Sequence, residues 1–263
     1  MKVQDFLLKK QTQQKITLVT CYDYAMAKIV ENTEIDCVLV GDSVSMVMHG
    51  FNDTTKATMP MMIMHTEAVA RAIKTKFIVA DLPFLSYRKS MADTVENVHA
   101  LIQAGAHSVK LEGVPGNIQI IQHLAESGVP VMGHIGLTPQ FIHHLGGYRV
   151  QGKEKQQADL LLKQAQELEQ AGCFALVLEC VPLELAKNIS HALQIPVIGI
   201  GAGPYTDGQV LVMHDLLGLQ DDISPKFVKN YLAGSNLLQQ AINAYVEEVK
   251  SLAFPALTQH CYQ

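Results

Sequence analysis

The sequence predicts an α/β protein, a (βα)8 TIM barrel with a short N-terminal helix and an extra C-terminal helix. Short apolar runs rich in β-branched residues alternate with longer segments of helical periodicity, which is the pattern of repeated βα units around a parallel sheet. The units are evenly spaced along 263 residues, a typical length for one barrel. Polar residues follow nearly every apolar run, as expected where all strands end at one mouth. A doubly wound open sheet has the same element order, but it would bind its ligand at a single crevice.

Seven apolar runs are clear strand candidates, because a parallel strand that is covered on both faces has no side that meets water. They span residues 16–22, 37–41, 77–80, 108–111, 130–133, 174–178 and 197–200. Residues 209–214 form a less distinct eighth candidate. Eight strands are enough to close a barrel whose interior is filled by side chains.

Segments with apolar residues at helical spacing lie between the strand candidates. They span residues 23–33, 61–75, 91–104, 118–126, 156–170 and 183–192. We expect residues 3–10 to form a short helix that plugs the lower end of the barrel, and residues 235–252 to form the extra C-terminal helix. Two connections, 43–60 and 138–155, are unusually long and start at the mouth, so we expect them to be lids, binding loops or oligomer contacts.

The composition indicates one large domain over residues 1–263, because no linker, charge block or low-complexity stretch divides the chain. Only 17% of the residues are charged and 48% are hydrophobic, which predicts that neighbouring subunits cover part of the surface in a homo-oligomer. The net charge of −5 is scattered and no Lys/Arg cluster occurs, so nucleic acid is not an expected partner.

The same sequence predicts no membrane association. No apolar run approaches the roughly 20 residues needed to cross a bilayer, and the first residues lack the apolar core of a signal peptide. The five cysteines have no CxxC spacing and mostly lie in apolar runs, which fits buried free thiols in a reducing compartment. We therefore expect a cytoplasmic protein.

Three acidic residues, Asp42, Asp81 and Glu112, end three consecutive strand candidates. Adjacent strands lie about 4.8 Å apart, so these side chains are expected to reach one ion. A carboxylate placed after a buried strand costs several kcal/mol to desolvate unless a cation or hydrogen bonds stabilise it. Oxygen ligands suit a hard cation, and the pattern predicts a Mg²⁺ site. The alternative is that each acid caps the helix that follows it.

Two further charged residues complete the expected site. Lys110 lies two positions before Glu112, so both side chains point to the same face of the strand, which should be the barrel interior. There Lys110 is expected to bind a substrate carboxylate or to form an ion pair with the acids. Glu179 ends the sixth strand, across the mouth from the other acids, and its position suits a general base. An ion pair with a Lys or Arg of a neighbouring strand is the alternative for Glu179.

The remaining polar features are less specific. His134 ends the fifth strand and is expected either to donate a hydrogen bond to a substrate oxygen or to serve as a satisfied structural group. His143 and His144 are adjacent and are interpreted as loop residues. The glycine-rich IGIGAGP segment (198–204) resembles a phosphate-binding turn but lacks the GxGxxG register, and tight turn geometry explains it equally well.

A hard cation beside a lysine, facing a carboxylate base, suits the enolisation of a 2-oxo acid. The cation would stabilise the enolate charge while Glu179 removes a proton from the neighbouring carbon. The resulting nucleophilic carbon needs an electrophile, which spacing and composition do not identify.

The phrases of this sequence resemble ketopantoate hydroxymethyltransferase, in that family's order and spacing and nearly end to end. They are TCYDYAMA, VGDSVSMV, HTEAVARA, VADLPFLSY, SVKLEG, GHIGLTPQ, GGYRVQGK, LVLECVP, IGIGAGP and DGQVLVMHDLLGL. The resemblance implies a barrel enzyme that transfers a one-carbon unit from 5,10-methylenetetrahydrofolate to 3-methyl-2-oxobutanoate. The product would be 2-dehydropantoate, for pantothenate biosynthesis, and the assembly a decamer.

The resemblance also implies roles for individual residues. Mg²⁺ would be surrounded by Asp42, Asp81 and Glu112, and Glu179 would be the proton acceptor. The oxo acid would be bound by Asp42, Ser43, Asp81 and Lys110. A hydroxyl such as that of Ser43, just past a strand, is otherwise expected to cap a helix or turn. The sequence departs from the family mainly in FNDTTKATMPMMIMHT, which is Met-rich where a TLPVTLDEM-like stretch is usual.

Two other functions remain open from the sequence. A lyase or mutase of the phosphoenolpyruvate and isocitrate lyase type also combines a barrel, Mg²⁺ and an oxo-acid enolate, but no KKCGH-like run occurs here. A sensor that binds a metal and an oxo acid without chemistry is the second alternative. Exchange of deuterium at C3 of 3-methyl-2-oxobutanoate separates an enolising enzyme from a sensor.

Overall fold

The computed structural model describes residues 1–220 and 225–262. The chain forms two compact units, Met1–Val212 and Met213–Gln263. All the strands within the described residues belong to the first unit. The expectation of one domain over residues 1–263 stays a prediction.

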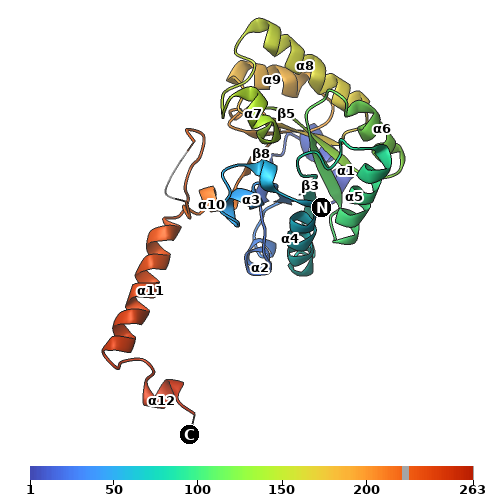
Figure 1. Ribbon diagram of the computed structural model, residues 1–263. Coiled ribbons are helices and arrows are strands. Elements are labelled where there is room, and N and C mark those ends of the chain that lie inside the picture. The colour runs from blue at the N-terminus through green and yellow to red at the C-terminus, as the bar shows by residue number, and fades with distance from the viewer. Residues whose placement is uncertain (221–224, 263) are drawn as a thin grey trace. The chain divides into compact units, whose positions relative to one another are not determined.

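Eight parallel strands form a closed barrel in the first unit, which confirms the expected fold class (Figure 1). They are β1 (Ile16–Thr20), β2 (Cys37–Val40), β3 (Phe77–Asp81), β4 (Ser108–Glu112), β5 (Val131–Gly136), β6 (Ala175–Glu179), β7 (Val197–Ile200) and β8 (Gly208–Leu211). Each strand pairs with the next along the chain, and β8 pairs with β1, where Leu18 lies opposite Val210. This closure excludes the doubly wound sheet, since an open sheet leaves two unpaired edge strands.

The last part of the barrel differs from the expectation. The strand expected at residues 209–214 is β8, and His214 lies instead in α10 (Met213–Leu216). β7 leads into β8 through residues 201–207 without a helix, so the alternation of strand and helix is incomplete here. Gly201 and Gly203 of this connection have φ angles of 61° and 79°, which side chains disfavour. Tight turn geometry therefore accounts for these glycines of the IGIGAGP segment.

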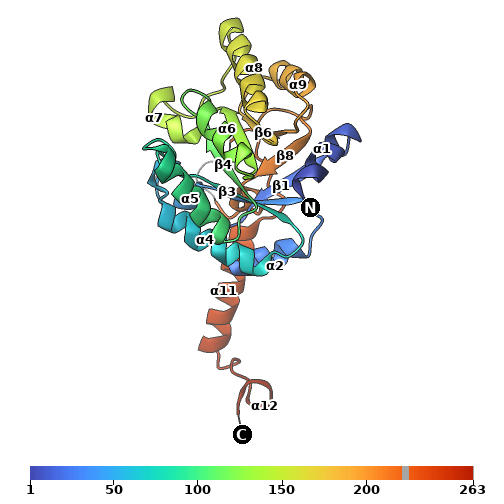
Figure 2. The same ribbon diagram turned by 90° about the vertical axis from the view of Figure 1, so that its right-hand side faces the viewer.

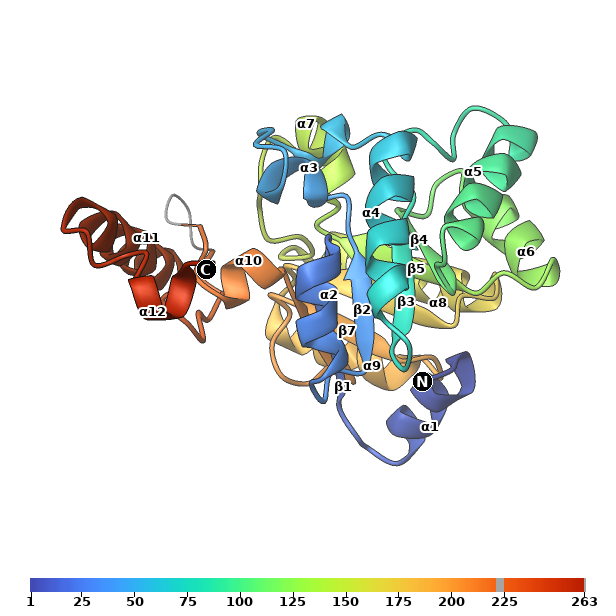
Figure 3. The same ribbon diagram turned by 90° about the horizontal axis from the view of Figure 1, so that it is seen from below.

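Helices surround the barrel, and all six segments expected between strands are helical. The helices of the first unit are α1 (Val3–Gln11), α2 (Tyr24–Glu31), α3 (Val44–Val47), α4 (Met59–Ala72), α5 (Met91–Gln103), α6 (Ile118–Glu126), α7 (Ile142–Leu145), α8 (Lys155–Gln170) and α9 (Leu183–Ala192). Figure 3 shows α4 beside β2 and β3, with α2 on its flank. Figure 2 shows α8 next to α9. The two long connections contain α3 and η1 (Thr54–Lys56), and η2 (Pro139–Phe141) and α7.

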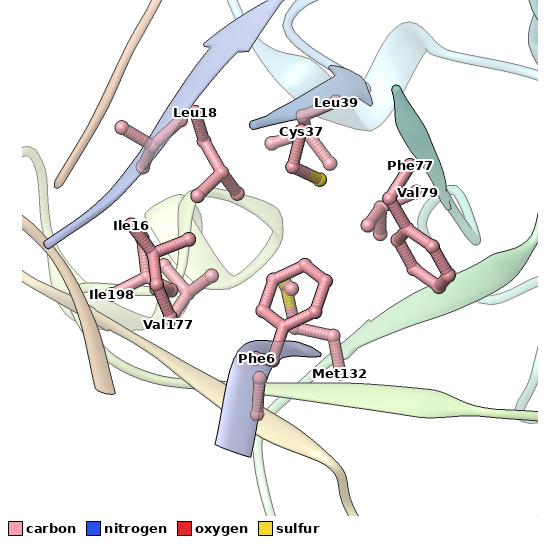
Figure 4. Packing of buried hydrophobic residues seen from close by; sticks show 12 residues of the cluster. Phe6, Ile16, Leu18, Cys37, Leu39, Phe77, Val79, Met132, Val177 and Ile198 are labelled. Carbon is pink, nitrogen blue, oxygen red and sulfur yellow. The ribbon is translucent and has the colours of Figure 1, made fainter. Parts of the chain in front are cut away.

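Helix α1 closes the lower end of the barrel, as expected. The Phe6 ring is fully buried and lies among the inward side chains of the strands, including Ile16, Met132 and Ile198 (Figure 4). Its centroid is 5.3 Å from that of Phe77, in an edge-to-face arrangement that aromatic rings prefer. An ion pair from Lys10 Nζ to Asp207 Oδ2, 2.9 Å long, also attaches the helix to the barrel.

Replacing Phe6 with alanine is expected to lower the free energy of unfolding by about 3–5 kcal/mol, because it removes a buried ring and leaves a cavity in the barrel interior. Equilibrium unfolding in urea measures the change. Leu8→Ala is the matched control, since Leu8 lies on the same helix and is 56% exposed. Equal effects of the two substitutions would show that α1 does not act through the packing of Phe6.

Three of the five cysteines, Cys21, Cys37 and Cys173, are buried free thiols, as the sequence predicts. Burial raises the pKa of Cys21 to about 11, so the thiol stays protonated. Cys180 is only half-buried and Cys261 is exposed, and these two differ from the general expectation. All five are free thiols rather than disulfides.

The second unit contains α10, α11 (Gly234–Lys250) and α12 (Leu257–His260). Helix α11 confirms the helix expected at residues 235–252. Along it, Leu238, Ile242, Tyr245 and Val249 recur at helical spacing and are 40–61% exposed. No helix in the part of the chain that the structure describes is both long and apolar enough to span a membrane.

Candidate active site

Three acidic side chains from consecutive strands lie at the carboxyl end of the barrel. Asp42 follows β2, and Asp81 and Glu112 are the last residues of β3 and β4. All three are buried. The backbone N–H of Asp42 donates to Asp81 Oδ2 over 3.0 Å. Gly41 suits this crowded turn, because a Cβ atom there would lie 2.9 Å from Ser43 Oγ. The structure thus brings the three expected acids to one mouth.

Lys110 lies inside the barrel among these acids, as its spacing from Glu112 predicts. It pairs in register with Asp81, and its Nζ atom lies 3.2 Å from Asp81 Oδ1 and 3.8 Å from Glu112 Oε1. Burial opposes the charge of Lys110, but attraction by the acids outweighs burial and raises its pKa above the usual value. Lys110 is therefore a cation at the pH of the cell.

The acids differ in their electrostatic surroundings. Burial, followed by repulsion from Asp81 and Glu112, raises the pKa of Asp42 well above its usual value. Burial also raises the pKa of Asp81, against the attraction of Lys110. For Glu112 the effect of burial is outweighed by His134 and Lys110, and its pKa is lowered. The ionised form of Asp42 is thus the least stabilised of the three acids, and an additional cation would stabilise it.

His134 joins the acidic cluster to Glu179. Its Nδ1 atom lies 3.2 Å from Glu112 Oε1 and 3.3 Å from Lys110 Nζ, and its Nε2 atom lies 3.2 Å from Glu179 Oε2. Although burial and the charge of Lys110 oppose protonation, Glu112 and Glu179 raise the pKa of His134 to about 9. A protonated His134 lies within ion-pair distance of both carboxylates, so the contact with Glu179 replaces the alternative of a Lys or Arg partner on a neighbouring strand.

Glu179 ends β6 on the opposite side of His134 from Glu112, and its side chain is 14% exposed. His134 lies between Glu179 and the acidic cluster and contacts both sides. The next residue, Cys180, has a φ angle of 48°, which is unusual for a residue with a side chain. Backbone hydrogen bonds hold this turn, from Cys180 N–H to the Ile200 oxygen and from Gln151 N–H to the Cys180 oxygen, each 2.9 Å long. The turn fixes the backbone immediately after the candidate base.

Ser43 precedes α3, but its side chain does not cap that helix. Its Oγ atom lies 2.8 Å from the hydroxyl of Tyr22, in hydrogen-bond contact. Tyr22 is 1% exposed, and burial raises the pKa of its hydroxyl above the usual value. The default expectation of a cap is therefore wrong, and the hydroxyl of Ser43 sits next to Asp42 in a position suited to a ligand.

Gln140 is the one central residue that sequence reasoning missed. It belongs to η2, in the long connection after β5, and is 2% exposed. Its Nε2 atom donates to Asp42 Oδ2 over 2.8 Å and to the Leu82 oxygen over 2.9 Å. Its backbone N–H donates to Glu112 Oε2 over 3.0 Å. The residue therefore holds two of the three acids at once.

Tyr87 in turn orients Gln140. The Tyr87 hydroxyl donates to Gln140 Oε1 over 2.7 Å, which fixes the side-chain amide so that its nitrogen faces Asp42. The only sequence signal was the phrase GHIGLTPQ, which ends on this glutamine. A single polar residue in a loop carries no chemical signature by itself, so nothing in its spacing indicated these contacts.

The donor set fits a hard cation in its chemistry. Asp81 Oδ1 and Glu112 Oε1 are buried and accept no hydrogen bond, although Lys110 and His134 lie within ion-pair distance of them. Oxygen atoms of this kind suit Mg²⁺, which retains several waters and binds through one or two carboxylates. Within residues 1–220 and 225–262, no three His, Cys, Asp or Glu side chains converge closely enough to hold an ion alone. A metal here would therefore need oxygens from water or substrate.

The other histidines do not join this cluster. His143 is exposed, with its Nε2 atom 3.7 Å from Asp53 Oδ2, and His144 is exposed as well. Both belong to α7, a short helix within the long connection. His49 and His65 contact each other through their Nε2 atoms over 3.0 Å, and His65 Nδ1 lies 2.5 Å from the backbone oxygen of Tyr22.

Comparison with known proteins matches this chain to one family. The model of the ketopantoate hydroxymethyltransferase family matches residues 1–257. A 3-methyl-2-oxobutanoate hydroxymethyltransferase of Legionella pneumophila (strain Lens) is 58% identical over 257 residues, covering 97% of this chain and 98% of that protein. The protein of the same name from Francisella tularensis subsp. tularensis (strain WY96-3418) is 56% identical, covering 98% and 97%.

Solved structures with the same fold are more distant in sequence. Phosphoenolpyruvate phosphomutase from Streptomyces platensis subsp. rosaceus superposes with a TM-score of 0.67 at 13% identity, covering 100% of this chain and 92% of that chain. A phosphonopyruvate hydrolase crystallised with oxalate and Mg²⁺ gives a TM-score of 0.64 at 10% identity, covering 98% and 93%. At these identities the similarity supports the barrel fold alone.

Proposed function

Because the chain belongs to the ketopantoate hydroxymethyltransferase family, we propose that it transfers a one-carbon unit from 5,10-methylenetetrahydrofolate to 3-methyl-2-oxobutanoate. The product is 2-dehydropantoate, an intermediate of pantothenate biosynthesis. The observation that carries this proposal is the arrangement at the barrel mouth, where Lys110 and the acids of three consecutive strands face Glu179 across His134.

The residues that would hold Mg²⁺ are Asp42, Asp81 and Glu112, completed by water or substrate oxygens. When bound, Mg²⁺ supplies stabilisation of the negative charge that develops on the oxo acid as it enolises. The charges of the cluster support a divalent cation. If Asp42, Asp81, Glu112 and Glu179 were all ionised and Lys110 and His134 both protonated, the cluster would carry two excess negative charges, which a divalent cation would balance.

The oxo acid would be bound by Lys110, Ser43 and His134 together with Asp42 and Asp81. Lys110 offers its ammonium group to the substrate carboxylate, and Ser43 offers a hydroxyl held by Tyr22. Glu179 accepts the proton from C3, which leaves a nucleophilic carbon. That carbon forms the new bond to the one-carbon unit, water supplies the oxygen of the hydroxymethyl group, and tetrahydrofolate leaves.

His134 has a positioning role in this scheme. Because its Nε2 atom contacts Glu179 and its Nδ1 atom contacts Glu112, it fixes the distance between the base and the acidic cluster.

The test of the proposed function is the formation of 2-dehydropantoate from 3-methyl-2-oxobutanoate and 5,10-methylenetetrahydrofolate, with and without Mg²⁺. We expect product only with both substrates, and a loss of about 10²-fold or more in rate after chelation. Deuterium exchange at C3 in the absence of folate is measured in parallel. A protein that binds the oxo acid without exchange would be a sensor, and the proposed activity would be wrong.

We also propose that the chain works as a homo-oligomer, with a decamer as the expected assembly, in the cytoplasm. The low content of charged residues and the exposed apolar side chains of α11 support self-association. Analytical ultracentrifugation of the full chain measures the assembly, and a monomer at micromolar concentration would contradict it.

A further inference from the structure

A cavity of about 610 Å³ lies in the first unit next to the acidic cluster. It is bounded by residues that follow β4, by the end of β5 with the connection after it, and by helix α8. Its lining includes Phe84, Val114, Phe141 and Leu161 as apolar walls, and Thr138 and Gln164 as polar groups. A smaller hollow of about 260 Å³ shares Phe84 and Phe141 with it and adds Arg88.

Three residues join the cavity wall to the candidate site. Gln140 lines the cavity and donates to Asp42. Gly113 lines it and directly follows Glu112, and its backbone N–H donates to the His134 oxygen over 2.9 Å. Gly136 lines it and pairs in register with Glu179. The cavity therefore borders the backbone next to Glu112 and His134, and it reaches Asp42 through the side chain of Gln140 and Glu179 through the strand neighbour Gly136.

We propose that this cavity binds the rings of the reduced folate that donates the one-carbon unit, an inference that rests on the function proposed above. The volume lies within the range of about 300–1,000 Å³ that is usual for sites of small organic ligands. Phe84 and Phe141 offer apolar faces to flat heteroaromatic rings, while Thr138 and Gln164 offer hydrogen bonds to ring edges. The position beside Gly136 and Gln140 brings a bound carrier next to the carbon that Glu179 activates.

Arg88 extends the proposed site to the charged end of the same ligand. It is half-buried in the adjoining hollow, and its Nη1 atom donates to the Pro115 oxygen over 2.5 Å. This bond holds the guanidinium near the rim, where its other N–H groups can bind a carboxylate. The glutamate end of a folate carries such carboxylates, whereas the oxo acid is bound at the acidic cluster.

The test uses the full-length protein and a substitution that fills the cavity. Gln164 on α8 lines the cavity and is half-buried, so Gln164→Trp places a large ring in it. Gln166→Trp is the matched control, since Gln166 is exposed on the same helix. For Gln164→Trp we expect the KM for 5,10-methylenetetrahydrofolate to rise about 10-fold or more, with C3 deuterium exchange of 3-methyl-2-oxobutanoate within about 2-fold of the unmodified protein. For Gln166→Trp neither quantity should change.

The exchange reaction separates the two proposals, because it needs no folate. If Gln164→Trp keeps the KM and kcat of the transfer reaction, the cavity is not the folate site, and the proposed activity stands. A parallel loss of exchange and transfer in Gln164→Trp would show that the substitution disturbs the barrel mouth as a whole, and this too would overturn the assignment. Absence of folate-dependent product in the unmodified protein would overturn both proposals. Tetrahydrofolate binding by calorimetry gives a second measurement, for which Arg88→Met should weaken affinity about 10-fold.

Discussion

Glu179→Gln is expected to lower the rate of C3 deuterium exchange by about 10²–10⁴-fold, because the amide has the size of the carboxylate but does not accept the proton. Binding of 3-methyl-2-oxobutanoate should change little, since the proposed contacts to the oxo acid come from Lys110, Ser43, His134, Asp42 and Asp81 and not from Glu179. Exchange is followed by NMR in deuterium oxide, and binding by calorimetry.

Glu184→Gln provides the control for this substitution. Glu184 lies in the first turn of α9, close in sequence to Glu179 but exposed, so the same chemical change there should leave exchange unaltered. If Glu179→Gln exchanged at the unmodified rate, another group would be the base.

The second large effect is expected at Gln140, where Gln140→Met removes the amide that bonds Asp42 and leaves the hydroxyl of Tyr87 with only its more distant acceptor, the Glu112 backbone oxygen at 3.3 Å. Residues that orient metal ligands typically contribute about 10–100-fold in metal affinity, and we expect a loss of that size. Titration with Mn²⁺, followed by electron paramagnetic resonance, measures the affinity directly. Thermal unfolding shows whether the variant is folded.

Tyr87→Phe is a milder substitution that tests the same prediction. It keeps the amide of Gln140 but removes the hydrogen bond that orients it, so the loss of Mn²⁺ affinity should be smaller than in Gln140→Met. The backbone bond from Gln140 to Glu112 persists in both variants. Unchanged affinity in a folded Gln140→Met protein would mean that the amide does not position Asp42.

The strands and most helices of this fold were predictable because each had a local cause. A parallel strand covered on both faces is a continuous apolar run, so β2 and β7 are recognisable from their composition alone. β8 was a less distinct strand candidate, because the exposed polar residue Gln209 interrupts its run of apolar residues. The missing helix between β7 and β8 had no local signal either, since the glycines of that connection fit a phosphate-binding turn and a tight turn equally.

The sequence predicted which residues form the candidate site better than it predicted the contacts between them. Asp42, Asp81 and Glu112 are recognisable because charges rarely follow buried strands without a partner. The contacts of His134 depend on the barrel register, which places it opposite Glu112 on one side and Val177 on the other. Gln140 depends on how a long connection folds back over the mouth, and no rule of spacing describes that path. The register and the path of that connection both depend on contacts between residues far apart in the sequence.

The position of Phe6 bears on the order in which this chain acquires its structure during synthesis. Phe6 precedes every strand of the barrel along this chain, yet the core cluster that contains its ring extends to Val210 on the last strand. Contacts between residues so distant along the chain form late, because the entropy of closing a long loop is lost before these contacts can stabilise the fold. In a nascent chain that does not yet include residue 210, the barrel core that packs around the Phe6 ring is therefore incomplete. The ring is then exposed and can bind chaperones or other incompletely synthesised chains.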